Sequence, residues 1–210
     1  YIPDSNTWTW VHGDTANSIP VFGTQGIPSP LNSPGLRFCN SNWTDQNNNL
    51  WFFGGILEGG DWMSDLWKYS IATNEWTWMK GQKERRQTGV KGTKGVADNN
   101  NVPRSRYETN ANWTDNDGNL WLYGGFSFDT GWPFGDMWKF NPLTMQWTWV
   151  NESIQSSYGK QGQANSSNAP GPRSIWTKWK DSNGNFWMFG GKTNHLINDG
   201  GFLNDLWRYE

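Results

Sequence analysis

The chain has 210 residues, and its 17 basic and 19 acidic side chains give a formal net charge of −2 at pH 7. This balance lacks the basic excess of a nucleic-acid-binding protein, and no run of about 18 apolar residues predicts a membrane span. Only 34% of the residues are hydrophobic, but 18 Trp and 11 Phe supply large areas for burial. We therefore expect one folded domain with an aromatic core.

The first predicted element is a strand within residues 1–10, at the end of this segment. Trp8 and Trp10 flank Thr9, and this alternation puts both indoles on one face of a strand. The pattern recurs at intervals of about 70 residues, as Trp76-Thr77-Trp78 and Trp147-Thr148-Trp149. Self-similarity at a long period predicts a repeat architecture such as a propeller.

Residues 11–80 form the first full repeat unit. Four short aromatic-rich runs, separated by Gly, Asn, Asp and Pro, predict four antiparallel strands. We label them a to d and expect them at about 37–44, 50–54, 66–70 and 75–80. The connection between strands a and b, residues 45–49, contains Asp and Asn, which are typical of a tight hairpin turn.

Residues 81–149 and 150–210 repeat this order, and the last unit lacks its own strand d. The strand-b sequence Leu50-Trp51-Phe52-Phe53-Gly54-Gly55 recurs twice, at 120–125 and 186–191. The strand-c sequence Asp65-Leu66-Trp67-Lys68-Tyr69 recurs at 136–140 and 205–209. We expect residues 1–10 to supply a strand d that completes a further blade.

These motifs resemble the kelch-repeat family: a Gly-Gly doublet closes the second strand, and an aromatic residue and a Trp follow it. The resemblance covers nearly the whole chain, although the units are longer than is usual in that family. It implies an all-β, kelch-type β-propeller of four-stranded antiparallel blades, with three blade equivalents in this chain. Trp residues at matching positions in every unit are then expected between the blades.

The long connections predict the working surface. The a–b and c–d turns are short and share one end of such a fold, whereas the b–c and d–a connections share the other end and are much longer. Long loops in a compact fold are usually functional or disordered. We therefore expect a non-catalytic module that binds a protein or a glycan through the b–c and d–a loops.

Two sets of repeated side chains are candidate binding residues at this end. Each b–c loop carries one aromatic residue, Trp62, Trp132 or Phe202, which either anchors a ligand or folds back to cap its blade. Each strand a begins with an arginine, Arg37, Arg106 or Arg173, which either contacts an acidic ligand or pairs with the Asp that opens strand c. We favour the packing role for both sets.

Catalysis and cofactors are not expected. Copper oxidases related to this fold need a Tyr–Cys crosslink and at least two histidine ligands, whereas His12 and His195 occupy non-equivalent positions and Cys39 is the only cysteine. A galactose-oxidase-like copper enzyme is therefore the least favoured alternative, and one cysteine excludes an intrachain disulfide. Acidic loop residues, such as Glu58, Asp61, Asp129 and Asp199, are weak candidates for calcium because they share no spacing.

Four sequons, at Asn42, Asn112, Asn151 and Asn165, are candidates for N-glycosylation. Asn42 and Asn112 occupy the same position of two blades, near the end that carries the tight turns. We expect their side chains to point to the opposite face of the strand from the neighbouring Trp43 and Trp113, where a glycan would be tolerated. The sequons and the Asn, Gly and Trp bias favour an extracellular or cell-surface glycoprotein, although an Asn-rich chain also contains sequons by chance.

Three blades leave an open edge at each end, since propellers need four to eight blades. Either a second copy completes the fold by head-to-tail pairing, or these residues are three blades of a longer polypeptide. The first case predicts the competing function, a structural glycoprotein subunit of an extracellular fibre or surface assembly.

Overall fold

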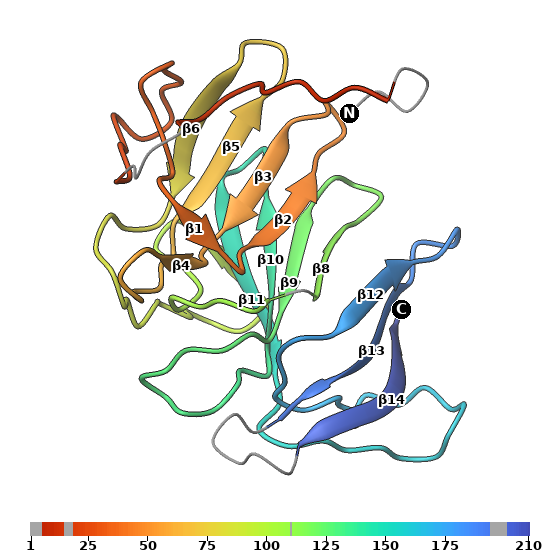
Figure 1. Ribbon diagram of the computed structural model, residues 1–210. Helices are drawn as coiled ribbons and strands as arrows, with labels where there is room; N and C mark the ends of the chain where they lie inside the picture. Colours follow the sequence, from red (N-terminus) through yellow and green to blue (C-terminus); the bar gives the residue numbers. More distant parts are fainter. Residues whose placement is uncertain (1–5, 15–18, 110, 194–200) are drawn as a thin grey trace.

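The computed structural model describes residues 6–14, 19–109, 111–193 and 201–210. Over these ranges the chain forms strands, turns and loops, and no described segment is a helix. The described residues therefore contain no helix that could cross a membrane. The strands form three large antiparallel sheets and one two-stranded ladder, and no described sheet closes into a barrel (Figure 1). The expectation of an all-β fold is confirmed for these residues.

The first sheet contains the four strands expected within residues 37–80. Its order is β2 (Ser41–Thr44), β3 (Leu50–Phe53), β5 (Leu66–Ser70) and β6 (Glu75–Lys80). The expected strand a, 37–44, was too long. Cys39 adopts a φ of 56°, so the chain turns there, and β1 (Arg37–Phe38) pairs instead with β4 (Ile56–Leu57).

The second and third sheets repeat this pattern with one addition and one difference. The second sheet is β8 (Ala111–Thr114), β9 (Leu120–Tyr123), β10 (Asp136–Asn141), β11 (Gln146–Glu152) and, outermost, β7 (Ala97–Asp98). The third sheet is β12 (Thr177–Lys180), β13 (Phe186–Lys192) and β14 (Phe202–Tyr209). Strand β7 belongs to a long connection for which the sequence predicted no strand.

Each hairpin between strands a and b is closed by an aspartate. In the first sheet the Asp45 carboxylate accepts hydrogen bonds from the backbone N–H groups of Asn47 and Asn49 and, at 2.7 Å, from the Trp51 indole. Asp115 and Asp181 accept the same three kinds of bond in the other two sheets. An aspartate that ties its own turn to the following strand fixes the hairpin register, as the sequence predicted.

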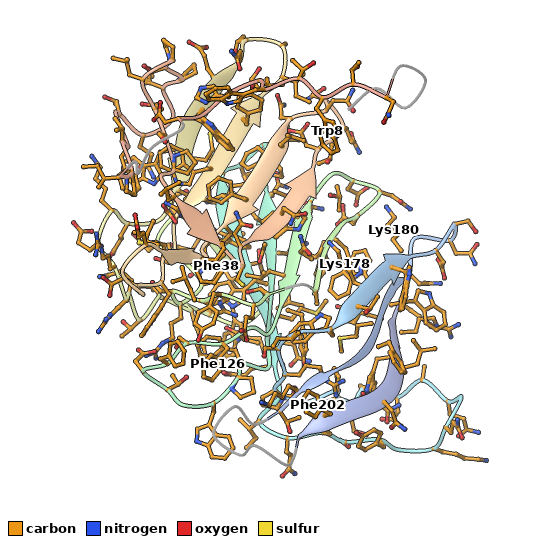
Figure 2. The ribbon with its side chains drawn as sticks, viewed as in Figure 1. Trp8, Phe38, Phe126, Lys178, Lys180 and Phe202 are labelled. Atoms are coloured by element: carbon orange, nitrogen blue, oxygen red, sulfur yellow. The ribbon has the colours of Figure 1, made fainter. Side chains whose placement is uncertain are left out.

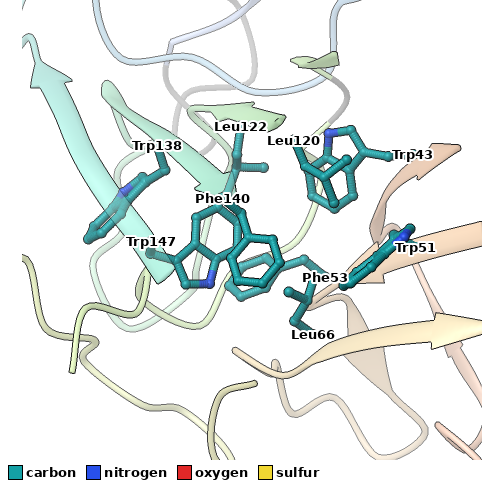
Figure 3. Packing of buried hydrophobic residues seen from close by; sticks show 9 residues of the cluster. All are labelled: Trp43, Trp51, Phe53, Leu66, Leu120, Leu122, Trp138, Phe140 and Trp147. Atoms are coloured by element: carbon teal, nitrogen blue, oxygen red, sulfur yellow. The ribbon is translucent and has the colours of Figure 1, made fainter. Parts of the chain in front are cut away.

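The sheets pack face to face through their aromatic residues. Between the first and second sheets lies one buried cluster (Figure 3), formed by Trp43, Trp51, Phe53 and Leu66 from the first sheet and Leu120, Leu122, Trp138, Phe140 and Trp147 from the second. A second cluster joins the second and third sheets, where the rings of Trp113 and Phe186 stack with centroids 5.0 Å apart. These contacts bury large aromatic areas without any helix.

The innermost strands of the three sheets lie next to one another. The Trp43 indole on β2 donates to the Trp121 carbonyl of the second sheet at 2.9 Å, and the Trp113 indole on β8 donates to the Trp179 carbonyl of the third sheet at 2.9 Å. Because the same bond recurs at both junctions, each sheet is placed against the next in the same way. The sheets consequently radiate from one shared region (Figure 1).

The expected packing of repeated Trp residues holds within the first two sheets but not at the two ends of the array. Trp8, Trp10 and Trp179 are exposed. Residues 6–10 join no named strand, so the expected strand d at 1–10 is not formed there, and residues 1–5 lie outside the described ranges.

Candidate functional site

Short turns occupy one end of the sheets and long connections the other (Figure 1). We call the second the loop end; it comprises the b–c loops at 54–65, 124–135 and 193–201 and the d–a connections at 81–110 and 153–176, of which the structure does not describe residues 110 and 194–200. In Figure 2, Phe38, Phe126 and Phe202 lie toward the loop end, whereas Trp8 lies at the other side of the molecule.

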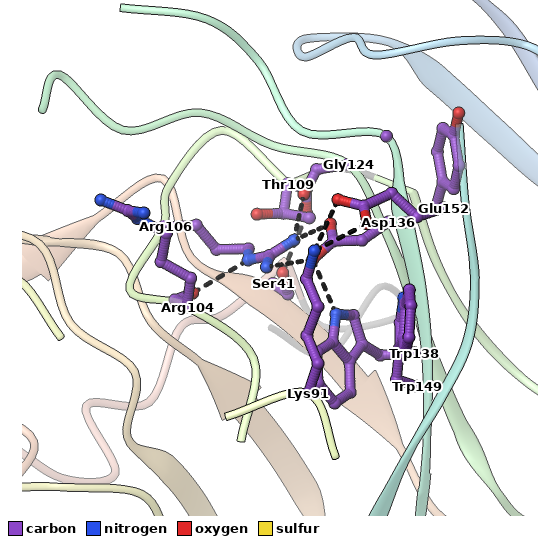
Figure 4. Close-up of polar contacts among 12 residues, drawn as sticks. Ser41, Lys91, Arg104, Arg106, Thr109, Gly124, Asp136, Trp138, Trp149 and Glu152 are labelled. Atoms are coloured by element: carbon purple, nitrogen blue, oxygen red, sulfur yellow. Dashed lines mark hydrogen bonds and ion pairs between the residues drawn. The ribbon is translucent and has the colours of Figure 1, made fainter. Parts of the chain in front are cut away.

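The three repeated arginines lie inside the loop end and do not reach its surface. Arg106 holds Asp136 with two hydrogen bonds of 2.6 and 2.7 Å, and its guanidinium also donates to the Gly124 carbonyl at 2.8 Å (Figure 4). Its side chain is fully buried. Arg173 makes two hydrogen bonds to Asp205, and Arg37 makes one to Asp65. Each also donates to the carbonyl of the first Gly of the doublet that ends its strand b, Gly190 or Gly54. These arginines are therefore not available to an acidic ligand.

The paired aspartates also hold the strand-c indoles. Trp67, Trp138 and Trp207 each donate to the aspartate two residues earlier, at 2.8, 2.7 and 2.6 Å. Burial raises the pKa of Asp136, but the charge and hydrogen bonds of Arg106 and the Trp138 bond outweigh it, so this pKa lies below its ordinary value. In the second sheet this ion pair joins the d–a connection, which carries Arg106, to the start of β10 and, through the Gly124 carbonyl, to the b–c loop.

The three b–c aromatic residues occupy different environments. Trp62 is only 4% exposed; it lies beside Tyr107 and Phe128, under the guanidinium of Arg86. Trp62 is thus packed among other rings, and it presents no exposed ring to a ligand. Trp132 and Phe202 are 57% and 77% exposed, and the Lys192 ammonium lies over the Phe202 ring, 5.4 Å from its centroid.

Sequence reasoning missed two further exposed aromatic residues, Phe38 and Phe128. Phe128 covers the buried group formed by Trp62, Tyr107 and Phe126, so its ring is held in place by ring contacts on its inner side. The sequence signal for Phe128 was its place three residues after the Gly124-Gly125 doublet. Phe38 follows the repeated arginine, and nothing in the sequence distinguished it from a core strand residue.

Three equivalent residues with left-handed backbone lie where the loop end meets the innermost strands. Cys39, Glu108 and Ile175 have φ of 56°, 55° and 54°, a conformation that is costly for a β-branched residue. The Glu108 N–H donates to the Cys39 carbonyl at 2.9 Å, and the Ile175 N–H donates to the Glu108 carbonyl at 3.4 Å. This chain of bonds joins the three repeats, and its side chains differ at each position.

The chemistry of these three positions does not favour a nucleophile. Burial, and then the charge of Glu108, raise the pKa of the Cys39 thiol, so the thiolate form is disfavoured. Burial also raises the pKa of Glu108, although hydrogen bonding from Ser174 and the charge of Lys192 act in the opposite direction. His12 lies beside Tyr69 in the first sheet, and His195 falls outside the described residues.

Of the four candidate calcium ligands, two carboxylates pair with arginines, Glu58 is exposed, and one residue falls outside the described residues. Asp61 pairs with Arg85 and Arg86 at 2.6 and 2.5 Å, and Asp129 pairs with Arg104. Among the residues that the structure describes, no three His, Cys, Asp or Glu side chains are grouped so that they could hold a metal ion. Asp199 belongs to the undescribed part of the b–c loop.

The sequons fall on different surfaces. Asn42 is exposed, but Asn112 is buried: its amide donates to the Asn42 carbonyl, and its oxygen accepts from Lys178. Both residues lie on innermost strands rather than on an outer surface, so the expectation of a tolerated glycan at Asn112 was wrong. Asn151 is exposed on β11, and Asn165 is exposed in the connection that precedes β12.

Lys178 stands at the position of Asn112 on the third innermost strand. Its ammonium donates to the Asn112 carbonyl at 2.6 Å, and burial lowers the pKa of Lys178 to about 8. Lys180, also on β12, donates to the Thr114 carbonyl at 2.8 Å (Figure 2). These lysines bind neighbouring backbone and tie the innermost strands together.

No family model matches this sequence, and no curated protein matches it. The solved structure of YjhT is similar at 14% sequence identity and a TM-score of 0.47, over 83% of this chain and 38% of that one. The chain therefore spans less than half the length of the YjhT structure.

Proposed function

We propose that residues 11–80, 81–149 and 150–210 are three consecutive blades of a kelch-type β-propeller, and that the loop end is its binding surface. Three antiparallel sheets with neighbouring innermost strands and a repeated cross-sheet Trp bond support this arrangement. In such a fold the long connections gather on one face, while the blades serve as a rigid frame.

The proposed activity is non-catalytic recognition of a protein or a glycan. The observation that carries it is a group of exposed aromatic side chains in or next to the loop end, including Phe38, Phe128, Trp132 and Phe202. An exposed ring stacks on the apolar face of a sugar or inserts into a partner's pocket, and such residues dominate many interfaces.

The test uses the double variant Trp132→Ala and Phe202→Ala against the matched control Leu143→Ala. Leu143 is 92% exposed, but it lies in the β10–β11 turn at the other end of the second sheet. Each chain is applied to a glycan array and to an array of extracellular proteins. We expect ligands bound by the wild type and the control to lose at least about 30-fold in affinity for the double variant. Equal binding by all three chains would refute the proposal.

A second candidate function is a structural subunit, and the open face of the third sheet favours it. This face presents Trp179, Trp187, Phe189 and Leu206, which line one apolar surface. Their counterparts in the first sheet, Trp43, Trp51, Phe53 and Leu66, are buried against the second sheet. Exposed apolar patches of this kind mark association surfaces. Light scattering tests this candidate, because a subunit of an extracellular assembly must self-associate.

A further inference from the structure

A cavity of about 390 Å³ lies between the innermost strands of the three sheets, β2, β8 and β12. Each strand contributes three consecutive residues to its lining: Asn42, Trp43 and Thr44; Asn112, Trp113 and Thr114; and Lys178, Trp179 and Lys180. The last residue of each set directly precedes the turn between strands a and b. The cavity therefore lies toward the end of the sheets that carries the short turns, away from the loop end.

Two positions of this cavity are neutral in the first two repeats and basic in the third. Lys178 stands where the other strands have Asn, and Lys180 stands where they have Thr. Figure 2 places both lysines on the side of β12 that faces β8. Lys178 is half-buried, whereas Lys180 is exposed, so solvent reaches the second charge directly.

The hydrogen bonds that these lysines make to the neighbouring strand do not need a positive charge. Lys178 and Lys180 donate to the carbonyls of Asn112 and Thr114 at 2.6 and 2.8 Å. One strand earlier, the Asn112 amide and the Thr114 hydroxyl donate to carbonyls of β2 in the same way. Neutral side chains thus make the same ties between innermost strands. The two charges are additional to this structural role.

Among the residues that the structure describes, no Asp or Glu lines the cavity. The aspartates of the adjoining turns, Asp45, Asp115 and Asp181, accept hydrogen bonds from their own turns instead. Burial lowers the pKa of Lys178 to about 8, and no neighbouring carboxylate acts in the opposite direction. Because charged groups that leave water are usually paired, this cavity favours a bound anion.

The spacing of the two ammonium groups fits one anion with several oxygens. Lys178 and Lys180 are two residues apart, and they donate to carbonyls that are also two residues apart on β8. Two residues of a strand span about 6.6 Å, and a bond from an ammonium to an anionic oxygen spans about 2.8 Å. An anion that presents separate oxygens can therefore accept from both lysines. The Asn42 amide and the Thr44 hydroxyl add neutral donors to the lining.

We propose that the cavity between β2, β8 and β12 binds a dianionic oxyanion through Lys178 and Lys180. The ligand group is the one that inorganic phosphate and sulfate share with their monoesters. Its two negative charges match the two ammonium groups, and the neutral side chains of β2 accept or donate the remaining hydrogen bonds. This inference goes beyond recognition at the loop end and involves none of the residues of that surface.

The test replaces each lysine by the residue at the same position of β8, as Lys178→Asn with Lys180→Thr, which preserves the ties between strands. The matched control, Lys94→Asn with Lys160→Thr, removes two positive charges from exposed connections. Calorimetric titration with sodium sulfate, against sodium chloride at equal ionic strength, gives the affinity of each chain. We expect the affinity for sulfate to fall at least about tenfold in the cavity variant and to be unchanged in the control.

Chemical protection of the wild type supplies a measurement that needs no variant. Amine acetylation, located by mass spectrometry of peptides, reports how readily each lysine reacts. Sulfate should slow the acetylation of Lys178 and Lys180, because a bound anion covers both ammonium groups and favours their charged forms. Lys160 should react at an unchanged rate. Lysines that only tie the strands together would not respond to sulfate, so this result does not depend on the folding of a variant.

Two further probes distinguish the sources of the oxyanion. Tighter binding of glycerol phosphate than of inorganic phosphate would support an esterified group as the ligand, and the reverse order would support a free ion. The proposal would be overturned by the absence of saturable binding of sulfate and of both phosphates, or by equal affinities of the wild type and the cavity variant. An equal loss of affinity in the control variant, or no protection of Lys178, would also overturn it.

Discussion

Replacement of Arg106 by alanine tests whether the repeated arginines stabilise the fold. Arg106 and Asp136 have side-chain exposures of 0% and 5%, and two hydrogen bonds join them. Without Arg106, the Asp136 carboxylate keeps only the Trp138 indole as a side-chain partner, at 2.7 Å. Loss of one member of a buried ion pair costs about 3–5 kcal/mol, because the remaining charge stays buried.

The comparison variant is Arg104→Ala. Arg104 pairs with Asp129, but these side chains are 28% and 32% exposed, so the loss should cost at most about 1 kcal/mol. Urea unfolding at pH 7, followed by Trp fluorescence, gives both free energies of unfolding. Addition of Asp136→Asn to Arg106→Ala should restore at least about 1 kcal/mol, since it removes the unpaired charge.

The pH dependence provides a second check on the same pair. In the wild type the pKa of Asp136 is lowered on folding, so its contribution to stability is present above about pH 4, the pKa of an unfolded aspartate, and is lost as the pH falls through the folded value. In Arg106→Ala, burial instead favours the protonated acid. The stability difference between the chains should therefore shrink from pH 7 toward pH 3. A cost of Arg106→Ala below about 1 kcal/mol, or a difference that does not change with pH, would refute this reasoning.

Three further predictions concern the hairpins and loops. Gly54 has φ of 68°, and a Cβ there would lie 2.6 Å from a backbone oxygen, whereas Gly60 has φ of 87° and open space around it. In urea unfolding, Gly54→Ala should therefore destabilise the chain by at least about 1 kcal/mol more than Gly60→Ala. Equal costs of the two substitutions would contradict this. Hydrogen bonds from an indole and an asparagine lower the pKa of Asp181 to about 2, so its stabilising effect is complete above about pH 4 and disappears as the pH falls toward 2. The melting temperature of Asp181→Asn should depend less on pH in this window than that of the wild type, and parallel curves would argue against the assignment. Trp62→Ala should cost about 3–5 kcal/mol in urea, while Trp132→Ala should cost less than about 1 kcal/mol; similar costs would show that Trp62 is not the packed member of the pair.

The sequence predicted the repeating elements well because their causes are local. In the first sheet, alternating aromatic residues produced strands b, c and d at the expected positions, whereas the same alternation in residues 6–10 gave no named strand; Asp45 and its two counterparts closed the expected hairpins. These features depend on the two-residue period of a strand and on side chains that hydrogen-bond their own turn. The pairing of Arg106 with Asp136 was also favoured from the sequence, since both residues recur together.

The exposure of individual side chains depended on what lies across from each sheet. Trp62 and Trp132 have similar positions in their loops, yet only Trp62 meets Tyr107 and Phe128 from the neighbouring repeat. Asn112 occupies the position in the second repeat that Asn42 has in the first. Lys178 and its innermost strand, β12, nevertheless bury the amide of Asn112. Such contacts join residues far apart in the chain, and the sequence of one unit does not specify them.

The sequence by itself determined that the chain is built from repeated antiparallel strands with an aromatic core, since strand period and turn chemistry act over a few residues. Only the tertiary structure showed that the innermost strands of the three sheets lie side by side, and that Lys178 and Lys180 line a cavity between them. These features arise from the packing of one sheet against another, which depends on surfaces assembled from distant parts of the chain.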